Sequence, residues 1–134
     1  MRVLVYSDLQ AGESHLRLFS DPTMSLQLYR VRKCYRDVAE LAKRERCTAV
    51  WDLGDTTDDR NAIPISTVDA VLEGLDLLPD NEFNFKLIGN HEQMLRSGSV
   101  HVGRMFGHKF TVVDKVAVYK LTNELQLVCA AYPA

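Results

Sequence analysis

The sequence lacks several features that mark particular classes of protein. It has only three cysteines, Cys34, Cys47 and Cys129, and no two of them have C-x-x-C spacing. Such cysteines argue against a disulfide framework and against a zinc finger, and they favour reduced thiols in a cytoplasmic protein. The N-terminal apolar run, residues 3–6, leads directly into Asp8. It is too short for a signal peptide or a membrane span.

The sequence also lacks an excess of positive charge. Sixteen lysines and arginines stand against eighteen aspartates and glutamates, so the net charge is −2. This balance argues mildly against a protein whose whole surface binds nucleic acid. The length of 134 residues, with 46% hydrophobic and 25% charged residues, suits a globular protein that buries one core. We therefore expect a single domain, residues 1–134, in the cytoplasm of a bacterial cell or a phage-infected host, with no membrane association.

Two kinds of apolar pattern alternate along the chain. Residues 2–7, 48–53 and 83–88 are apolar and rich in β-formers, which predicts strands buried on both faces of a parallel sheet. Between them, apolar residues at helical spacing predict one helix over residues 25–46 and a second from Pro64. The expected fold is α/β, with helices packed on a parallel core sheet.

The C-terminal part has a different pattern. We expect a short helix over residues 97–106. Residues 110–113, 115–121 and 124–131 then alternate in the manner of strands, and Thr122-Asn123 predicts a hairpin turn between the last two. These later strands are expected to extend the core sheet and to end in a C-terminal hairpin.

One face of the first predicted helix is basic. Two interpretations of this face are open: a solvated face of an amphipathic helix, which we favour, or a surface that binds a phosphate backbone. The basic residues are Arg30, Arg32, Lys33, Arg36, Lys43 and Arg44.

Polar residues follow each of the three predicted strands. Asp8 and Gln10 come after the first strand, Asp55 after the second, and Asn90 and His91 after the third. The carboxyl ends of parallel strands lie at one edge of a sheet, so these side chains are expected to meet there. Oxygen ligands gathered in this way predict a site for a hard metal ion. The alternative is a set of helix caps and turns, in which aspartate and asparagine are also common.

The order of these motifs resembles the calcineurin-like metallophosphoesterase superfamily. Its signature runs Asp-x-His, Gly-Asp-x-x-Asp and Gly-Asn-His-(Asp/Glu), with further histidines near the C-terminus. The matching segments here are Asp8-Leu9-Gln10, Gly54-Asp55-Thr56-Thr57-Asp58 and Gly89-Asn90-His91-Glu92. The resemblance covers about the first 95 residues. It implies a layered metallophosphoesterase-like sheet and hydrolysis of phosphodiester bonds by metal-activated hydroxide.

The resemblance implies two divalent metal ions, with Mn²⁺ expected first and Mg²⁺, Fe or Zn²⁺ as alternatives. Two cations close together can screen the charge of a phosphodiester and stabilise its leaving oxygen. Asp55 would bridge the two metals, Asp8 and Gln10 would bind one of them, and Asn90 would bind the other. His91 would lie beside the substrate and stabilise or protonate the leaving group.

Further residues have roles outside the metal ligands. The resemblance implies that Asp58 and Glu92 orient the loops and the histidine. Arg60 would reach Asp58 or the substrate phosphate. His15, in the loop after the first strand, is a candidate substrate contact, although a solvated loop residue is the favoured interpretation.

Two departures from the family pattern bear on catalysis. Gln10 stands where the family has histidine, and a glutamine oxygen gives a weaker and harder metal site than imidazole. The C-terminal histidine motifs are missing, and His101 and His108 follow His91 too closely to replace them, so we expect both at the surface or at a helix end. We therefore expect either a fragment of a longer enzyme or a natural short form without catalysis.

Within the superfamily, the long first loop, the basic helix and residues 54–60 look most like the exonucleases of double-strand-break repair. This branch implies a nucleic acid substrate, exonuclease or endonuclease activity on DNA, and a homodimer or a partner ATPase. Small phosphatases and cyclic-nucleotide phosphodiesterases are alternatives within the family. A non-catalytic binding or regulatory module that keeps the fold is the alternative of a different class.

Overall fold

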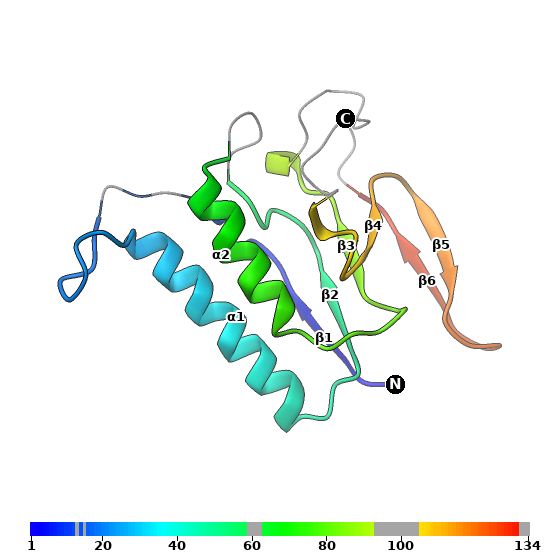
Figure 1. The fold of residues 1–134 in the computed structure, drawn as a ribbon. Helices are drawn as coiled ribbons and strands as arrows, with labels where there is room; N and C mark the ends of the chain where they lie inside the picture. Colours follow the sequence, from blue (N-terminus) through cyan, green and yellow to red (C-terminus); the bar gives the residue numbers. More distant parts are fainter. Residues whose placement is uncertain (13, 15, 59–62, 93–104, 132–134) are drawn as a thin grey trace.

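Four short parallel strands form the sheet on which the rest of the chain is arranged (Figure 1). They are β1 (Val3–Tyr6), β2 (Ala49–Asp52), β3 (Phe85–Leu87) and β4 (Thr111–Val113), and they lie side by side in this order. The computed structural model describes residues 1–12, 14, 16–58, 63–92 and 105–131. The predicted parallel α/β core is confirmed, because each of the three predicted core strands forms at its expected place.

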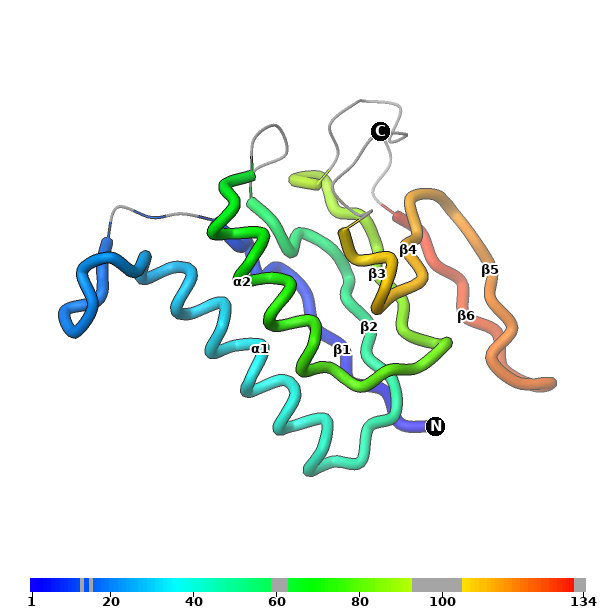
Figure 2. The backbone as a smooth tube through the Cα atoms, in the orientation of Figure 1, coloured from blue at the N-terminus to red at the C-terminus, as the bar shows by residue number. Residues whose placement is uncertain are grey.

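Two helices cover one face of this sheet, as the ribbon and the tube both show (Figures 1 and 2). Helix α1 spans Leu26–Arg44 and helix α2 spans Ile65–Asp76. Ser25 caps α1, since its hydroxyl accepts a hydrogen bond from the backbone N–H of Leu28 at 3.5 Å. The helices pack on each other and on the sheet through buried side chains. Those at the centre of this core are Leu4, Val31, Tyr35, Val50, Val71 and Leu75.

A hairpin forms a separate layer on the other face of the sheet. Strands β5 (Ala117–Lys120) and β6 (Gln126–Cys129) pair with each other in antiparallel register, and the predicted turn at residues 122–123 joins them. The ring of Tyr119 lies 4.5 Å, between centroids, from the ring of Phe85 on β3. Adjacent residues of a strand point to opposite faces of the sheet. On β2, Val50 accordingly packs with the helices, while Trp51 packs with the apolar residues of the hairpin.

The expectation that all the later strands extend the core sheet is therefore only partly right. β4 does extend it, by pairing with β3. The hairpin does not, because its apolar residues cover the face that the helices leave open. The predicted helix over residues 97–106 lies outside the described residues, apart from its last two positions.

Several charges on the basic face of α1 are paired within the protein. The Arg32 guanidinium lies 2.8 Å from the Glu73 carboxylate and 3.6 Å from that of Asp69, both on α2. Lys33 pairs with Asp37 one turn along α1. These contacts favour the interpretation of this face as a solvated, ion-paired surface.

Two further predictions concern the cysteines and the membrane. Cys34, Cys47 and Cys129 are free thiols, as expected. Among the described helices, neither has the length and apolar character that crossing a bilayer requires.

Candidate functional site

The loops that follow β1 and β2 are joined to each other by backbone hydrogen bonds. The N–H of Asp8 donates to the carbonyl of Gly54 at 3.0 Å, and the N–H of Gln10 donates to the carbonyl of Asp55 at 3.0 Å. A further bond runs from the N–H of Ala11 to the same loop. The pairing of the two strands thus continues past their ends, and it brings three of the predicted metal ligands onto adjacent loops.

These same three residues have an uncommon backbone conformation. The φ angles of Asp8, Gln10 and Asp55 are 57°, 49° and 54°, and that of the neighbouring Gly54 is 110°. The left-handed region is sparsely populated by residues with a side chain, and aspartate enters it more readily than glutamine. Such strained positions cluster at functional sites, because the surrounding structure must hold them there.

The loop after β3 packs directly against Asp55. A Cβ atom at Gly89 would lie 2.1 Å from Asp55 Oδ1 and 2.6 Å from the Asp55 backbone nitrogen, so only glycine fits this approach. The next segment is a 3₁₀ turn, Asn90–Glu92, in which the backbone N–H of His91 donates to Asp55 Oδ1 at 3.0 Å. The chain thus brings Asn90 and His91 beside the loop that carries Asp55.

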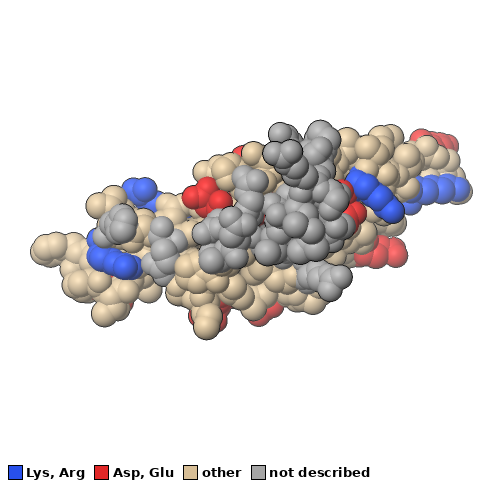
Figure 3. Space-filling model, turned by 90° about the horizontal axis from the view of Figure 1, so that it is seen from above, with Lys and Arg blue, Asp and Glu red and all other residues tan. Residues whose placement is uncertain are grey.

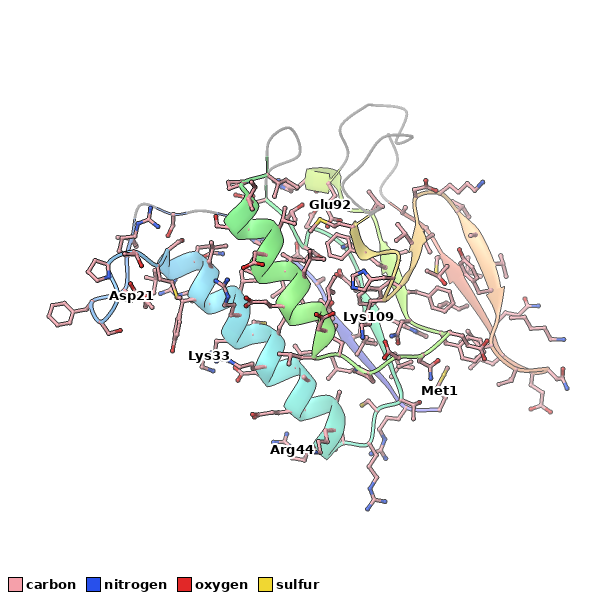
Figure 4. The ribbon with its side chains drawn as sticks, viewed as in Figure 1. Met1, Asp21, Lys33, Arg44, Glu92 and Lys109 are labelled. Carbon is pink, nitrogen blue, oxygen red and sulfur yellow. The ribbon has the colours of Figure 1, made fainter. Side chains whose placement is uncertain are left out.

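Glu92 holds the loops after β2 and β3 together. Its side chain is fully buried, and Oε2 accepts hydrogen bonds from the backbone N–H groups of Asp55 and Gly89, each at 3.1 Å. Oε1 accepts a bond from the N–H of Thr56 at 3.0 Å. Figure 4 shows Glu92 at the end of the molecule opposite Met1 and Arg44, which is the end where β2 and β3 terminate.

A buried charge network that the sequence analysis missed lies behind these loops. The ammonium of Lys86 on β3 is 2.9 Å from Glu92 Oε1 and 3.1 Å from Asp52 Oδ2 on β2. It also donates to the hydroxyl of Thr56 at 2.7 Å. A signal was present in the sequence, since Asp52 and Lys86 each interrupt an apolar strand. A charged residue in a buried strand requires an oppositely charged partner.

Two tyrosines line the same region on the helix side of the sheet. Burial, followed by the negative charge of Asp52, raises the pKa of Tyr6 well above its usual value. Burial, again followed by Asp52, raises the pKa of Tyr35, whose ring meets that of Tyr6 edge to face. Both phenols are therefore neutral beside the network at any physiological pH.

The predicted ligands differ from this network in their exposure. Asp8 and Gln10 are exposed, and Asp55, Asn90 and His91 are partly exposed, so a solute can reach all five. His91 Nδ1 lies 3.3 Å from the carbonyl oxygen of Asp58 and 3.6 Å from its carboxylate, with the Asp58 side chain 60% exposed.

The donor chemistry of the predicted ligands is uniform. Asp8 and Asp55 offer carboxylate oxygens, and Gln10 and Asn90 offer amide oxygens. Within the described part of the chain, no three side chains among histidine, cysteine, aspartate and glutamate gather in a metal-binding arrangement. The donors predicted for this edge are thus all oxygens, and an all-oxygen set suits Mg²⁺ or Mn²⁺ better than Zn²⁺.

The other histidines and Arg60 contribute nothing that can be described at this edge. Arg60, His15 and His101 lie outside the described residues. His108 is at the surface, as expected, with Nε2 3.9 Å from the Asp76 carboxylate. Seen from above, acidic and basic side chains are mixed across the described surface, which has no single-sign face in this view (Figure 3).

Comparison with known proteins adds no family assignment. No family model matches the chain, and no curated protein matches it in sequence. The resemblance to metallophosphoesterases therefore depends on the three motifs themselves.

Proposed function

We propose that the chain forms the metal-binding core of a metal-dependent phosphoesterase of the calcineurin-like superfamily. The observation that supports this most is the joining of the loops after β1 and β2, which puts Asp8, Gln10 and Asp55 on neighbouring strained positions. The loop with Asn90 and His91 contacts Asp55 from the third strand. The motifs thus have both the order and the strand-end placement that the resemblance implies.

The residues at this edge fit a hard divalent cation. Two carboxylates and two amides provide oxygen donors and leave the remaining coordination positions to water or substrate. A cation held there would offset the charge of a phosphodiester and make water a better nucleophile. Mn²⁺ is the expected ion, with Mg²⁺ next, while Fe and Zn²⁺ would lack the imidazole ligands that favour them.

His91 has a position suited to proton transfer. In the doubly protonated ring, Nδ1–H donates to the carbonyl oxygen of Asp58 and so holds the ring, while the proton on Nε2 can pass to the leaving oxygen of the substrate and leave a neutral imidazole. The main-chain bond from His91 to Asp55 keeps this ring next to the candidate ligands. Glu92 then fixes the loop on which both residues depend.

The substrate and partners follow from the resemblance alone. We propose a phosphodiester of DNA as the substrate and a cytoplasmic enzyme that works as a homodimer or with a partner ATPase. Small phosphatases and cyclic-nucleotide phosphodiesterases are the other members that the motifs allow.

A non-catalytic binding or regulatory module is the second candidate function. It is favoured by the donor set, because four oxygen donors are enough to hold one cation but supply few ligands for two. Such a module would bind Mn²⁺ and a partner or nucleic acid without hydrolysis.

The test compares the native chain with three variants in Mn²⁺ binding, by calorimetry, and in hydrolysis of bis-p-nitrophenyl phosphate and linear DNA. Asp55→Asn keeps an oxygen that can accept the bond from His91 but removes the charge, so we expect loss of both binding and turnover. His91→Ala is expected to keep the metal and to lose turnover by about 100-fold or more. Asp37→Asn, an exposed aspartate on α1, is the matched control and should behave as the native chain.

Each outcome separates the candidates. Equal loss of Mn²⁺ binding in Asp55→Asn and His91→Ala would contradict the assigned roles. Mn²⁺ binding without hydrolysis by the native chain would favour the binding module. Absence of Mn²⁺ binding would overturn both.

A further inference from the structure

Lys86 is the residue on which the buried network converges. Its ammonium group has three hydrogens, and three oxygen acceptors surround it: Asp52 Oδ2 at 3.1 Å, Glu92 Oε1 at 2.9 Å and Thr56 Oγ1 at 2.7 Å. The side chains of Lys86, Asp52 and Glu92 are all 0% exposed. The ring of Phe106 covers the ammonium at 4.4 Å from its centroid.

The two carboxylates that Lys86 holds are also the two that fix the ligand-bearing loops. Glu92 accepts the N–H groups of Asp55 and Gly89, and so joins the loop after β2 to the loop after β3. Asp52 Oδ1 accepts the N–H of Gly54 at 2.9 Å, and the carbonyl of Gly54 accepts the N–H of Asp8. The loop after β2 is therefore connected to Lys86 through both carboxylates, the loop after β3 through Glu92, and the loop after β1 through Asp52 by way of Gly54.

The register of the sheet explains why a lysine can do this. Asp52 and Lys86 are direct partners across the pairing of β2 and β3, and both side chains point to the helix side. β2 ends at Asp52 itself and β3 ends one residue after Lys86, so the ammonium lies just beneath the edge at which the loops begin.

Stability alone does not account for the arrangement. A buried ion pair is often no more stabilising than apolar side chains of the same volume, because desolvation opposes the attraction. Here two buried carboxylates share one ammonium, which is less favourable still. What a charged network provides and an apolar one does not is a fixed direction for each backbone N–H that it binds.

We infer that Lys86 is a positioning residue for the candidate metal site. Through Glu92 and Asp52 it fixes the backbone of the loops that present Asp55 and Asp8, without contacting metal or substrate. The part of this inference that concerns metal rests on the proposed function, whereas the part that concerns the loops does not.

The test uses Lys86→Met, which keeps the length of the side chain and removes the charge. In the metal-free protein, hydrogen exchange by NMR should show about tenfold or greater loss of protection at the loop amides of Asp55, Thr56 and Gly89, relative to the amides of β2 itself. Mn²⁺ affinity should fall by about tenfold or more, as for other residues that support metal ligands. Val71→Ala, a buried position in α2 away from the loops, is the control for lost stability.

The control should lower the melting temperature while keeping loop protection and Mn²⁺ affinity within about twofold of the native values. If Lys86→Met does not fold, Thr56→Val keeps the shape and removes the hydroxyl that bridges Lys86 and Asp52, and it should show the same two losses to a smaller degree. Native protection of the loop amides in Lys86→Met, or in Thr56→Val if that is the variant that folds, would overturn the inference. If the native chain binds no Mn²⁺, the proposed function fails, but the exchange measurement still decides the role of Lys86.

Discussion

Replacing Gly89 by alanine should disrupt the candidate site while leaving the sheet and helices in place. The new Cβ atom would lie 2.1 Å from Asp55 Oδ1, 2.6 Å from Asp55 Cγ and 2.6 Å from the Asp55 backbone nitrogen. The carboxylate can turn away, but the backbone nitrogen cannot move without its loop. That loop is held by Glu92, so relief of the clash requires hydrogen bonds to break.

The magnitude follows from these contacts. Overpacking of a rigid region destabilises a protein by about 1–3 kcal/mol. The bonds most exposed to the change are those from the Asp55 N–H to Glu92 and from the His91 N–H to Asp55, and each contributes about 1 kcal/mol. With one of these two bonds lost, we therefore expect Gly89→Ala to lower the free energy of unfolding by about 2–4 kcal/mol. Mn²⁺ affinity should fall by about tenfold or more, because Asp55 is displaced.

Urea denaturation and Mn²⁺ calorimetry measure the two effects, and two other glycines provide controls. At Gly12 an added Cβ would lie 3.6 Å from the Cβ of Asp58, an ordinary contact, so Gly12→Ala should change stability by less than about 0.5 kcal/mol. At Gly74 the added Cβ would lie 2.1 Å from Tyr35 Cδ2, at the crossing of α1 and α2. Gly74→Ala should therefore reduce stability and keep Mn²⁺ affinity.

The reasoning would be refuted by a Gly89→Ala protein with native stability and native Mn²⁺ affinity. That result would mean that the loops after β2 and β3 do not approach each other as described. A similar loss of affinity in Gly74→Ala would show that affinity follows overall stability and not the local contact.

Two further predictions concern the core. Asn84 is buried, its Oδ1 accepts the N–H of Val50 at 2.9 Å and its Nδ2 donates to the carbonyl of Pro79 at 2.8 Å. Asn84→Ala leaves these groups unpaired and should lower the free energy of unfolding by about 2–4 kcal/mol in urea titrations; a loss below about 1 kcal/mol would contradict this account. The second prediction concerns pH: the folded-state pKa of Tyr6 is raised above the usual 10.0, so its contribution to stability is complete below pH 10.0 and is lost as the pH rises further. Denaturation curves recorded below and above pH 10.0 test this: Tyr6→Phe should reduce the alkaline fall in the free energy of unfolding by up to about 1.4 kcal/mol per pH unit. An unchanged dependence of the free energy of unfolding on pH would contradict the burial of this phenol.

The elements that periodicity defines were predictable from the sequence. The apolar run around Val50 and the helical spacing around Val31 each identify a buried element. A strand buried on both faces is apolar throughout, and a helix buried on one face has apolar residues at helical spacing. Element ends were less accurate, with residues 48–53 predicted for β2 against Ala49–Asp52 observed. The first and last residues of an element bond to loops and caps, and these contacts leave little pattern in the sequence.

The position of the hairpin was not predictable in the same way. Alternation around Tyr119 indicates a strand with one apolar face, but it does not say which surface that face covers. The contact between Tyr119 and Phe85 determines which surface the hairpin covers, and it joins residues that are far apart in the sequence. The hairpin therefore covers the second face of the sheet and does not extend its edge.

At the candidate site, sequence patterns identified the solvent-accessible residues and the buried Glu92, but missed the buried Lys86 and Asp52. Asp8, Asp55 and Asn90 were found because polar residues after apolar strands stand out. The apolar pattern places Lys86 and Asp52 within their strands and does not indicate a role at the site, although a charge in a buried strand implies a partner. The positive φ of Gln10 has no sequence signal; it occurs where the N–H of Gln10 bonds to the carbonyl of Asp55 in the loop after β2.

The central claim is that Asp8, Asp55 and Asn90 present oxygens to a shared divalent cation at the carboxyl edge of the sheet. Anomalous scattering from crystals of the native chain soaked in Mn²⁺ tests it most directly. The account predicts an anomalous peak bounded by these three side chains and absent from Asp55→Asn crystals treated in the same way. A map with no peak at this edge, or with Mn²⁺ only at other surface carboxylates, would contradict it.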